Sequence, residues 1–187
     1  SIQNVEEILT VLAGYQIQCR VYMVSLLEIQ QKIMAEASNK LWIILFRRSM
    51  IKLASMIAEQ LDVPALISGE SVGQVASQTL SNIRATADAA DRPILRPLAG
   101  LNKEDIIRIA EKIGTYEISI EPYDDCCSFF VPIHPETKAD LEIVRKTEAN
   151  IDFGGMFATA LKDAEIKTFK HPDYVRKSIN RLEKVSD

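Results

Sequence analysis

Residues 67–80 read Ile-Ser-Gly-Glu-Ser-Val-Gly-Gln-Val-Ala-Ser-Gln-Thr-Leu, and this stretch decides the fold class. It is preceded by a short apolar run at 63–67, whose length is typical of a strand in a parallel sheet. Gly69 has no Cβ, so it allows a tight turn and a close approach of a ligand to the backbone. From Val72 to Ile83 the apolar residues recur at helical spacing. The stretch therefore predicts a strand, a turn and a helix in succession.

The opposite face of this predicted helix is polar but carries no charge. It includes Gln74, Ser77 and Gln78. A solvated helix face usually recruits Lys and Glu, so an amide and hydroxyl face favours a polar partner. The start of a helix also attracts phosphate or carboxylate groups. The pattern is equally compatible with amides that pack against a neighbouring loop.

Composition narrows the class of protein. The chain has 187 residues, 47% of them hydrophobic, which is enough for one domain with its own core. A net charge of -4 argues against a free-standing nucleic-acid binder, which would be basic. Three cysteines are too few for a disulfide scaffold and favour reduced thiols in the cytoplasm. The sequence contains no apolar run of about 18 residues, so no membrane segment is predicted.

Predicted strands and helices alternate along the chain. Strands are expected at 17–25, 63–67 and 94–95, and helices at 2–12, 26–37, 40–61, 72–83, 102–113 and from about 136. This order predicts an α/β fold, a Rossmann-like parallel sheet with helices on both faces. Between 115 and 135 regular patterns disappear, and so long a loop in a compact domain is usually functional or disordered.

Cys126 and Cys127 are the leading candidates for reactive groups. Sulfur chemistry needs an accessible thiolate or persulfide, and a loop provides access. The neighbouring Asp124 and Asp125 would raise a thiol pKa, so a nucleophile here needs a cation from elsewhere, such as Arg47. The alternative is a pair of small buried residues.

Arg47 and Arg48, with Lys52 one turn later, form a basic spot on a predicted helix. Guanidinium groups suit a phosphate. A solvated helix face would give the same pattern.

Several motifs together resemble one family, the tRNA 4-thiouridine synthetases, also called thiamine-biosynthesis sulfurtransferases. They are Phe46-Arg-Arg-Ser-Met50, the 69–80 stretch, Leu95-Arg-Pro-Leu98, Lys103-Glu-Asp-Ile-Ile107, Ile113-Gly-Thr115, Pro122-Tyr-Asp-Asp-Cys-Cys127 and Pro135-Glu-Thr-Lys138. The resemblance covers roughly residues 1–168 and implies a domain of the adenine nucleotide alpha-hydrolase type. Residues 169–187 are expected to form an amphipathic C-terminal tail.

The resemblance implies an enzyme that uses ATP, with Mg²⁺, to adenylate a tRNA uridine and then inserts persulfide sulfur to give 4-thiouridine. It implies a second role in sulfur supply for thiamine thiazole synthesis. Arg47, Gly69 and Gln78 fall on nucleotide-binding positions, with Gln74 and Ser77 as a supporting polar face. Cys126 falls on the sulfur-handling position, and Cys127 is the second choice. A cysteine desulfurase or another persulfide donor is the implied partner. An exposed first helix and the amphipathic tail favour a homodimer.

One part of the family pattern is missing from these residues. The pyrophosphate-binding loop, Ser-Gly-Gly-x-Asp-Ser, does not occur, nor does the RNA-binding module that precedes it. That loop is a nest of backbone N–H groups for the leaving pyrophosphate. We therefore expect a fragment that lacks the N-terminal part of the adenylating domain and binds ATP weakly or not at all. The alternative is a non-catalytic nucleotide-binding or interaction module that retains the fold.

Overall fold

The computed structural model describes residues 2–122 and 135–171, and these residues form two units. The described parts of unit 1 are 2–23, 104–122 and 165–171, and those of unit 2 are 24–103 and 135–164. Each unit is treated separately below. Among the described residues no helix combines the length and the apolar composition needed to cross a membrane.

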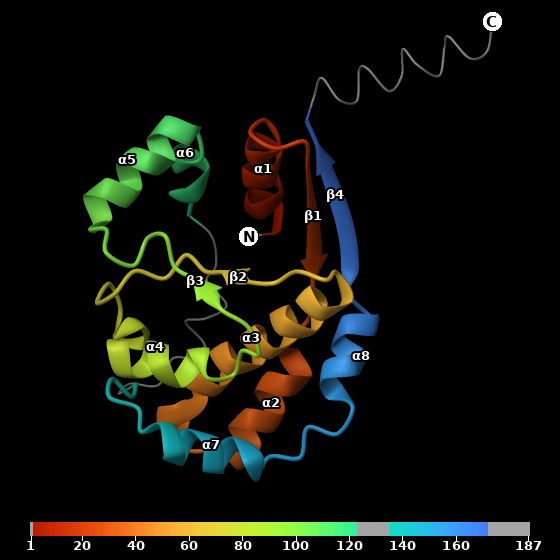
Figure 1. Cartoon of the computed structure of the whole chain (residues 1–187), viewed down its shortest axis with the longest axis vertical. Coiled ribbons are helices and arrows are strands. Elements are labelled where there is room, and N and C mark those ends of the chain that lie inside the picture. Colours follow the sequence, from red (N-terminus) through yellow and green to blue (C-terminus); the bar gives the residue numbers. More distant parts are fainter. Residues whose placement is uncertain (1, 123–134, 172–187) are drawn as a thin grey trace, which may run out of the picture. The chain divides into compact units, whose positions relative to one another are not determined.

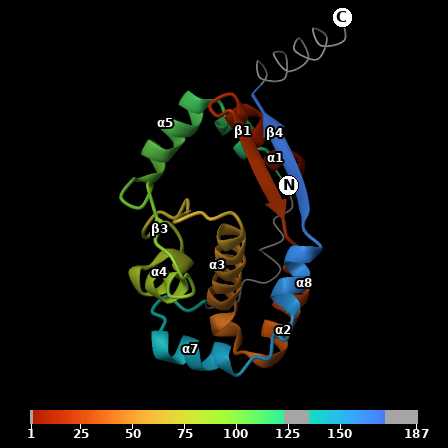
Figure 2. The same cartoon turned by 45° about the vertical axis from the view of Figure 1, so that its right-hand side comes forward.

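Unit 1 is built on an antiparallel strand pair (Figures 1 and 2). Strand β1 (Gln18–Met23) pairs with β4 (Glu165–Lys170), so that Gln18 lies opposite Lys170 and Met23 opposite Glu165. Helix α1 (Ile2–Ala13) packs on both strands, and Lys167 Nζ lies 2.5 Å from Glu6 Oε1. Helices α5 (Lys103–Ile113) and α6 (Tyr116–Ser119) complete the unit. The predicted strand at 17–25 is confirmed, but its partner strand is antiparallel rather than parallel.

Unit 2 is organised around one long helix, α3 (Trp42–Gln60), which packs against four other helices. These are α2 (Leu27–Glu36), α4 (Leu80–Ala87), α7 (Leu141–Ala149) and α8 (Met156–Lys162). A 3₁₀ turn, η1 (Asn39–Leu41), precedes α3. The single tryptophan, Trp42, donates its Nε1–H to the carbonyl of Ala37 at 3.0 Å, which ties the start of α3 to the end of α2.

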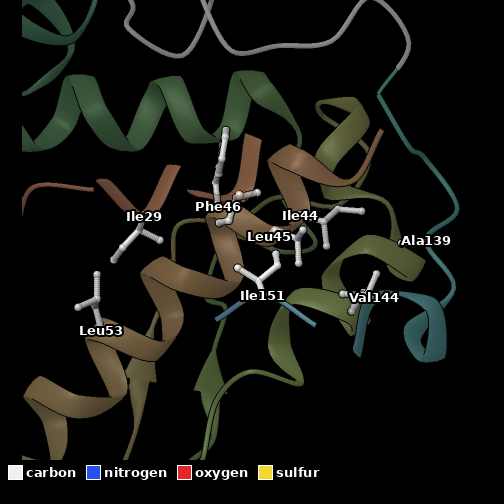
Figure 3. Packing of buried hydrophobic residues seen from close by; sticks show 10 residues of the cluster. Ile29, Ile44, Leu45, Phe46, Leu53, Ala139, Val144 and Ile151 are labelled. Atoms are coloured by element: carbon white, nitrogen blue, oxygen red, sulfur yellow. The ribbon is translucent and has the colours of Figure 1, made fainter. Parts of the chain in front are cut away.

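The hydrophobic core of unit 2 lies between these helices (Figure 3). Ile29, Ile33, Leu45 and Val144 are fully buried in it. They come from α2, α3 and α7, whose apolar residues recur at helical spacing. Beside this core, β2 (Leu66–Ile67) and β3 (Ile94–Leu95) form a short parallel ladder. The parallel sheet predicted from the sequence is thus confirmed for this pair alone among the described strands.

The helix prediction for 72–83 is wrong before Leu80, and only residues 80–83 are part of an α-helix. Gly73 has φ +79°, a backbone conformation outside the helical region, and a 3₁₀ turn, η2 (Ala76–Gln78), follows it. Helix α4 begins only at Leu80, where the Thr79 hydroxyl accepts a hydrogen bond from Asn82 N at 3.2 Å. The apolar stripe expected on one buried face is instead largely exposed, 53% at Val75 and 70% at Leu80.

Two residues of the predicted basic spot on α3, Arg48 and Lys52, form ion pairs inside unit 2. The Arg48 side chain is only 4% exposed, and its guanidinium contacts Glu148 at 2.7 Å, Asp88 at 3.2 Å and the carbonyl of Ala85. Lys52 Nζ lies 2.9 Å from Glu148 Oε1. Arg48 and Lys52 therefore hold helices α3, α4 and α7 together, and neither reading of the sequence, a phosphate site or a solvated face, describes Arg48.

Acid should weaken this ion-pair network. Burial alone would raise the pKa of Glu148, but hydrogen bonds from Arg48 and Lys52 outweigh burial and hold it below the unfolded value of 4.5. A carboxylate with a lowered folded pKa adds stability above the unfolded pKa and loses it as the pH falls through the folded pKa. We expect the urea midpoint to stay constant between about pH 7 and about pH 5 and to fall below about pH 4.5.

The control for this prediction is Glu148→Gln, in which the titrating group is absent. Its urea midpoint should fall less in acid than that of the wild type. An equal fall in both proteins would contradict a role for Glu148 in the acid response.

Asn82 joins α4 to residues 136–139. It is fully buried; its Nδ2 donates to the carbonyl of Glu136 at 2.7 Å and its Oδ1 accepts from Ala139 N at 3.0 Å. The hydroxyl of Thr79 donates to the carbonyl of Thr137 at 2.7 Å. Side chains of the first turn of α4 thus satisfy the backbone of a segment more than 50 residues away in sequence.

Replacing Asn82 with alanine should destabilise unit 2 by about 2–4 kcal/mol, because one buried and one half-buried backbone group lose their partners. Chemical denaturation followed by fluorescence measures this change. Asn39→Ala is the control, since Asn39 is exposed in η1 and its loss should cost no more than about 0.5 kcal/mol. Equal stability of the two variants would show that the Asn82 hydrogen bonds contribute nothing.

Candidate functional site

Residues 68–72 leave β2 and turn past the end of the neighbouring strand. Ser68 N donates to the carbonyl of Leu95 at 2.9 Å, and Ser71 Oγ donates to the carbonyl of Leu101 at 2.9 Å. The carboxyl ends of the two parallel strands therefore lie side by side. In open α/β sheets this is the edge at which ligands bind.

Glu70 is the centre of a polar cluster at this edge. It is 5% exposed, and its Oε1 forms an ion pair with Arg47 Nη2. Its Oε2 accepts hydrogen bonds from Arg96 Nε at 2.7 Å and from Ser68 Oγ at 2.9 Å. The other terminal nitrogen of Arg47 donates to Ser77 Oγ at 3.2 Å. Four segments of unit 2 thus contribute to one cluster.

The carboxyl of Glu70 is ionised at neutral pH. Burial alone would raise its pKa, but hydrogen bonds from Arg96 and Ser68 and the charge of Arg47 lower it below the usual 4.5. One carboxylate faces two guanidinium groups, so the cluster carries a net charge of about +1. Such a cluster is suited to an anionic ligand.

A cavity of about 500 Å³ opens beside this cluster. Its polar lining comes from Arg47, Ser68 and Glu70. The other lining residues are apolar: Met50, Ile51, Ala54, Leu66, Ile67 and Ile94. The volume and the combination of apolar walls with a few polar groups are typical of small-molecule sites.

The structure brings the predicted residues Arg47, Gly69 and Ser77 close to this cavity, because Glu70 follows Gly69 and contacts Arg47 directly. Gly69 does not have a positive φ. Beyond Gly69 itself and its two chain neighbours, no described atom lies within 4 Å of the position that a Cβ would take there, so the space beside Gly69 is open. That openness agrees with close approach by a ligand.

Gln78 lies in the 3₁₀ turn η2 and not on the face of a longer helix. Its Oε1 accepts a hydrogen bond from Ser71 N at 3.3 Å, and its backbone carbonyl accepts one from Gly73 N at 3.0 Å. Gln78 therefore closes the loop that leads from the site to η2. Gln74 is exposed on this loop. Contact of either amide with a ligand stays a prediction.

Cys126 and Cys127 lie outside the described residues, so their distance from this cluster is not given by the structure. Cys19, the remaining cysteine, is a free, half-buried residue of β1. In the ranges 2–122 and 135–171, no three His, Cys, Asp or Glu side chains gather as a metal site.

Sequence reasoning missed Glu70, Ser68 and Arg96. A signal for two of them exists: Glu70 is the one charged residue between Ile67 and Ile83, and Arg96 directly follows the neighbouring strand. The carboxyl ends of adjacent parallel strands share an edge, so these two opposite charges could have been paired from the sequence.

Comparison with known proteins gives consistent matches. The family model described as "Thiamine biosynthesis protein (ThiI)" matches residues 1–153. A "Probable tRNA sulfurtransferase" of Thermus thermophilus is 44% identical over 161 residues, which is 86% of this chain and 40% of the relative. One of Caldanaerobacter subterraneus subsp. tengcongensis is 45% identical over 151 residues, 81% of this chain and 40% of the relative.

The fold has a close match among solved structures. A 4-thiouridine synthetase crystallised as an RNA complex with bound ATP superposes with a TM-score of 0.86 at 36% identity, covering 90% of this chain and 45% of that one. This chain spans 40% of the length of the two curated relatives named above.

Proposed function

Since the chain belongs to the ThiI family of thiamine biosynthesis proteins, we propose that it forms the nucleotide-binding part of an ATP-dependent tRNA sulfurtransferase. The Glu70 cluster and its cavity support this proposal most directly. They combine apolar walls, open space beside Gly69 and a net charge of about +1, at the strand edge where α/β proteins bind ligands. The names of the relatives and the ATP and RNA of the matched synthetase agree with it.

In the proposed reaction the carbonyl oxygen of a tRNA uridine attacks the α-phosphate of ATP, and pyrophosphate leaves. The terminal sulfur of a persulfide then bonds to the ring carbon that carries this oxygen, the carbon–oxygen bond breaks, and AMP leaves with the oxygen. A second thiol attacks the inner sulfur of the former persulfide, so that the sulfur–sulfur bond to the base breaks and a disulfide forms. The product is 4-thiouridine. Arg47 binds an anionic group of the nucleotide, and Gly69, which has no Cβ, allows the nucleotide to approach the backbone. Cys126 or Cys127 carries or accepts the persulfide sulfur. Mg²⁺ bound with ATP would offset phosphate charge.

Partners follow from this chemistry. The substrates are a tRNA and a persulfide from a donor such as a cysteine desulfurase, and the same sulfur can supply thiamine thiazole synthesis. Reduced thiols fit a cytoplasmic reaction. On α1, Ile2 and Val5 are exposed, which supports a homodimer that covers this helix.

A chimera tests the function. The 187-residue chain replaces the matching 161-residue segment of the Thermus thermophilus relative, and the chimera is expressed in a strain whose tRNA lacks 4-thiouridine. We expect mass spectrometry of tRNA nucleosides to show 4-thiouridine again. The parent relative is the positive control. A soluble, folded chimera that restores none would contradict the enzymatic proposal and favour the non-catalytic module.

A further inference from the structure

The two carboxylate oxygens of Glu70 contact different partners. Oε2 is held by Arg96 and Ser68, both from the parallel strand edge, while Oε1 holds the guanidinium of Arg47 on α3. Arg47 and Glu70 line the cavity, whereas Arg96 is not among its lining residues. Glu70 therefore stands between a cation behind it and a cation at the cavity.

The charges separate in the same way. Arg96 neutralises Glu70, so the charge of Arg47 remains for a ligand in the cavity. A guanidinium carries five N–H donors, and the contacts of Arg47 with Glu70 and Ser77 engage one hydrogen on each terminal nitrogen. The group is thereby fixed in orientation while donors are left for an anion.

We propose that Glu70 is a positioning residue that fixes the Arg47 guanidinium at the polar end of the cavity, so that it meets an anionic group of the nucleotide in one orientation. The inference rests on the proposed function, because it takes ATP as the ligand. A long, flexible side chain that is already ordered loses less freedom on binding. Glu70 thus favours anion binding although it is itself an anion.

If Glu70 has this role, its replacement should change the ATP affinity in the direction opposite to that expected from charge alone. Glu70→Gln removes a negative charge from the site and would tighten ATP binding if charge alone mattered. If Glu70 positions Arg47, the same variant should bind ATP about tenfold more weakly. Glu59→Gln is the matched control, because it removes the same charge from an exposed residue of α3 that pairs with Arg92. We expect its ATP affinity to equal that of the wild type.

The measurement uses NMR spectra of the full 187-residue chain with its arginine side chains labelled, titrated with ATP to millimolar concentrations. In the wild type, the Arg47 side-chain signals should show restricted rotation and shift with ATP. In Glu70→Gln they should show free rotation, and in Glu70→Asp an intermediate behaviour. ATP binding by Glu70→Gln that is equal to or tighter than wild type would overturn the proposal.

Two further experiments distinguish a failure of the positioning role of Glu70 from a failure of the proposed nucleotide-binding function. Should Glu70→Gln fold poorly, Glu70→Gln/Arg96→Gln keeps the wild-type net charge and should still show a mobile Arg47 and weakened binding. Unchanged Arg47 rotation in these variants overturns the positioning role alone. Restricted Arg47 rotation in the chimera with the Thermus thermophilus relative, together with no response of that chimera to ATP, overturns the nucleotide function and the ligand assigned to Arg47.

Discussion

In the chimera, replacing Cys126 with alanine is expected to lower 4-thiouridine formation by a factor of at least about 1,000. Sulfur transfer needs a thiol that can carry or accept a persulfide, and the alanine side chain can do neither. The adenylation step uses no thiol in the proposed reaction. ATP-dependent release of pyrophosphate by the variant should therefore continue at close to the wild-type rate, as single-turnover assays with tRNA would show.

Cys127→Ala and Cys19→Ala are the matched controls. The resemblance to the family favours Cys126, so Cys127→Ala should retain more activity than Cys126→Ala, and Cys19→Ala should be unaffected because Cys19 belongs to β1. Full activity of Cys126→Ala would remove this residue from the mechanism. Loss of activity only in Cys127→Ala would exchange the two assignments.

The second large effect concerns stability. Arg48→Met should lower the free energy of unfolding of unit 2 by about 3 kcal/mol. This is the lower end of the range for breaking a buried ion pair, because Glu148 keeps Lys52 and Asp88 keeps Arg145 as partners. The buried carbonyl of Ala85 also loses its guanidinium donor. Urea unfolding at neutral pH measures the change.

Two variants show whether the loss comes from an unpaired buried charge. Lys32→Met removes a cation from a more exposed i,i+4 pair with Glu36 in the same unit, and we expect a much smaller change. Arg48→Met/Glu148→Leu removes both charges of the buried pair and should recover more than half of the loss. A double variant that is less stable than Arg48→Met would show that Glu148 matters through other contacts.

The sequence predicts correctly those helices whose apolar residues recur at helical spacing up to a recognisable end. The patterns at 26–37, 40–61 and 102–113 correspond to α2, α3 and α5, since each has an apolar stripe and a clear end. At 72–83 the apolar residues do recur at helical spacing. Gly73 nevertheless adopts a positive φ, and its N–H donates to the carbonyl of Gln78. Periodicity alone could not reveal this.

Strand β4 was missed for a related reason. Glu165–Lys170 alternates charged and apolar residues weakly, and its residues pair with β1 residues that lie 142 to 152 positions earlier in the chain. The direction of β1 pairing could not be predicted either, because alternating helices and strands favour parallel pairs in general. The burial of Arg48 depends on Glu148, 100 residues later, and no local signal identifies that partner.

For the site, the family motifs identified Arg47, Gly69 and Ser77, which the structure places around the Glu70 cluster. They did not identify Glu70 itself as a structural centre, because its importance lies in contacts with two segments distant in sequence, around Arg47 and Arg96. A motif identifies residues by their type and spacing. The burial of Glu70 and its two opposite charges can be recognised only in the folded structure.

Trp42 offers a spectroscopic consequence of the fold. As the single indole of the chain, tied to Ala37 within unit 2, it makes tryptophan emission, excited selectively over that of tyrosine, a reporter of that unit. Circular dichroism at far-ultraviolet wavelengths records helices of both units. If the melting curves from the two signals coincide, the chain unfolds in one cooperative transition. If they separate, unit 1 with its antiparallel strand pair melts independently of unit 2.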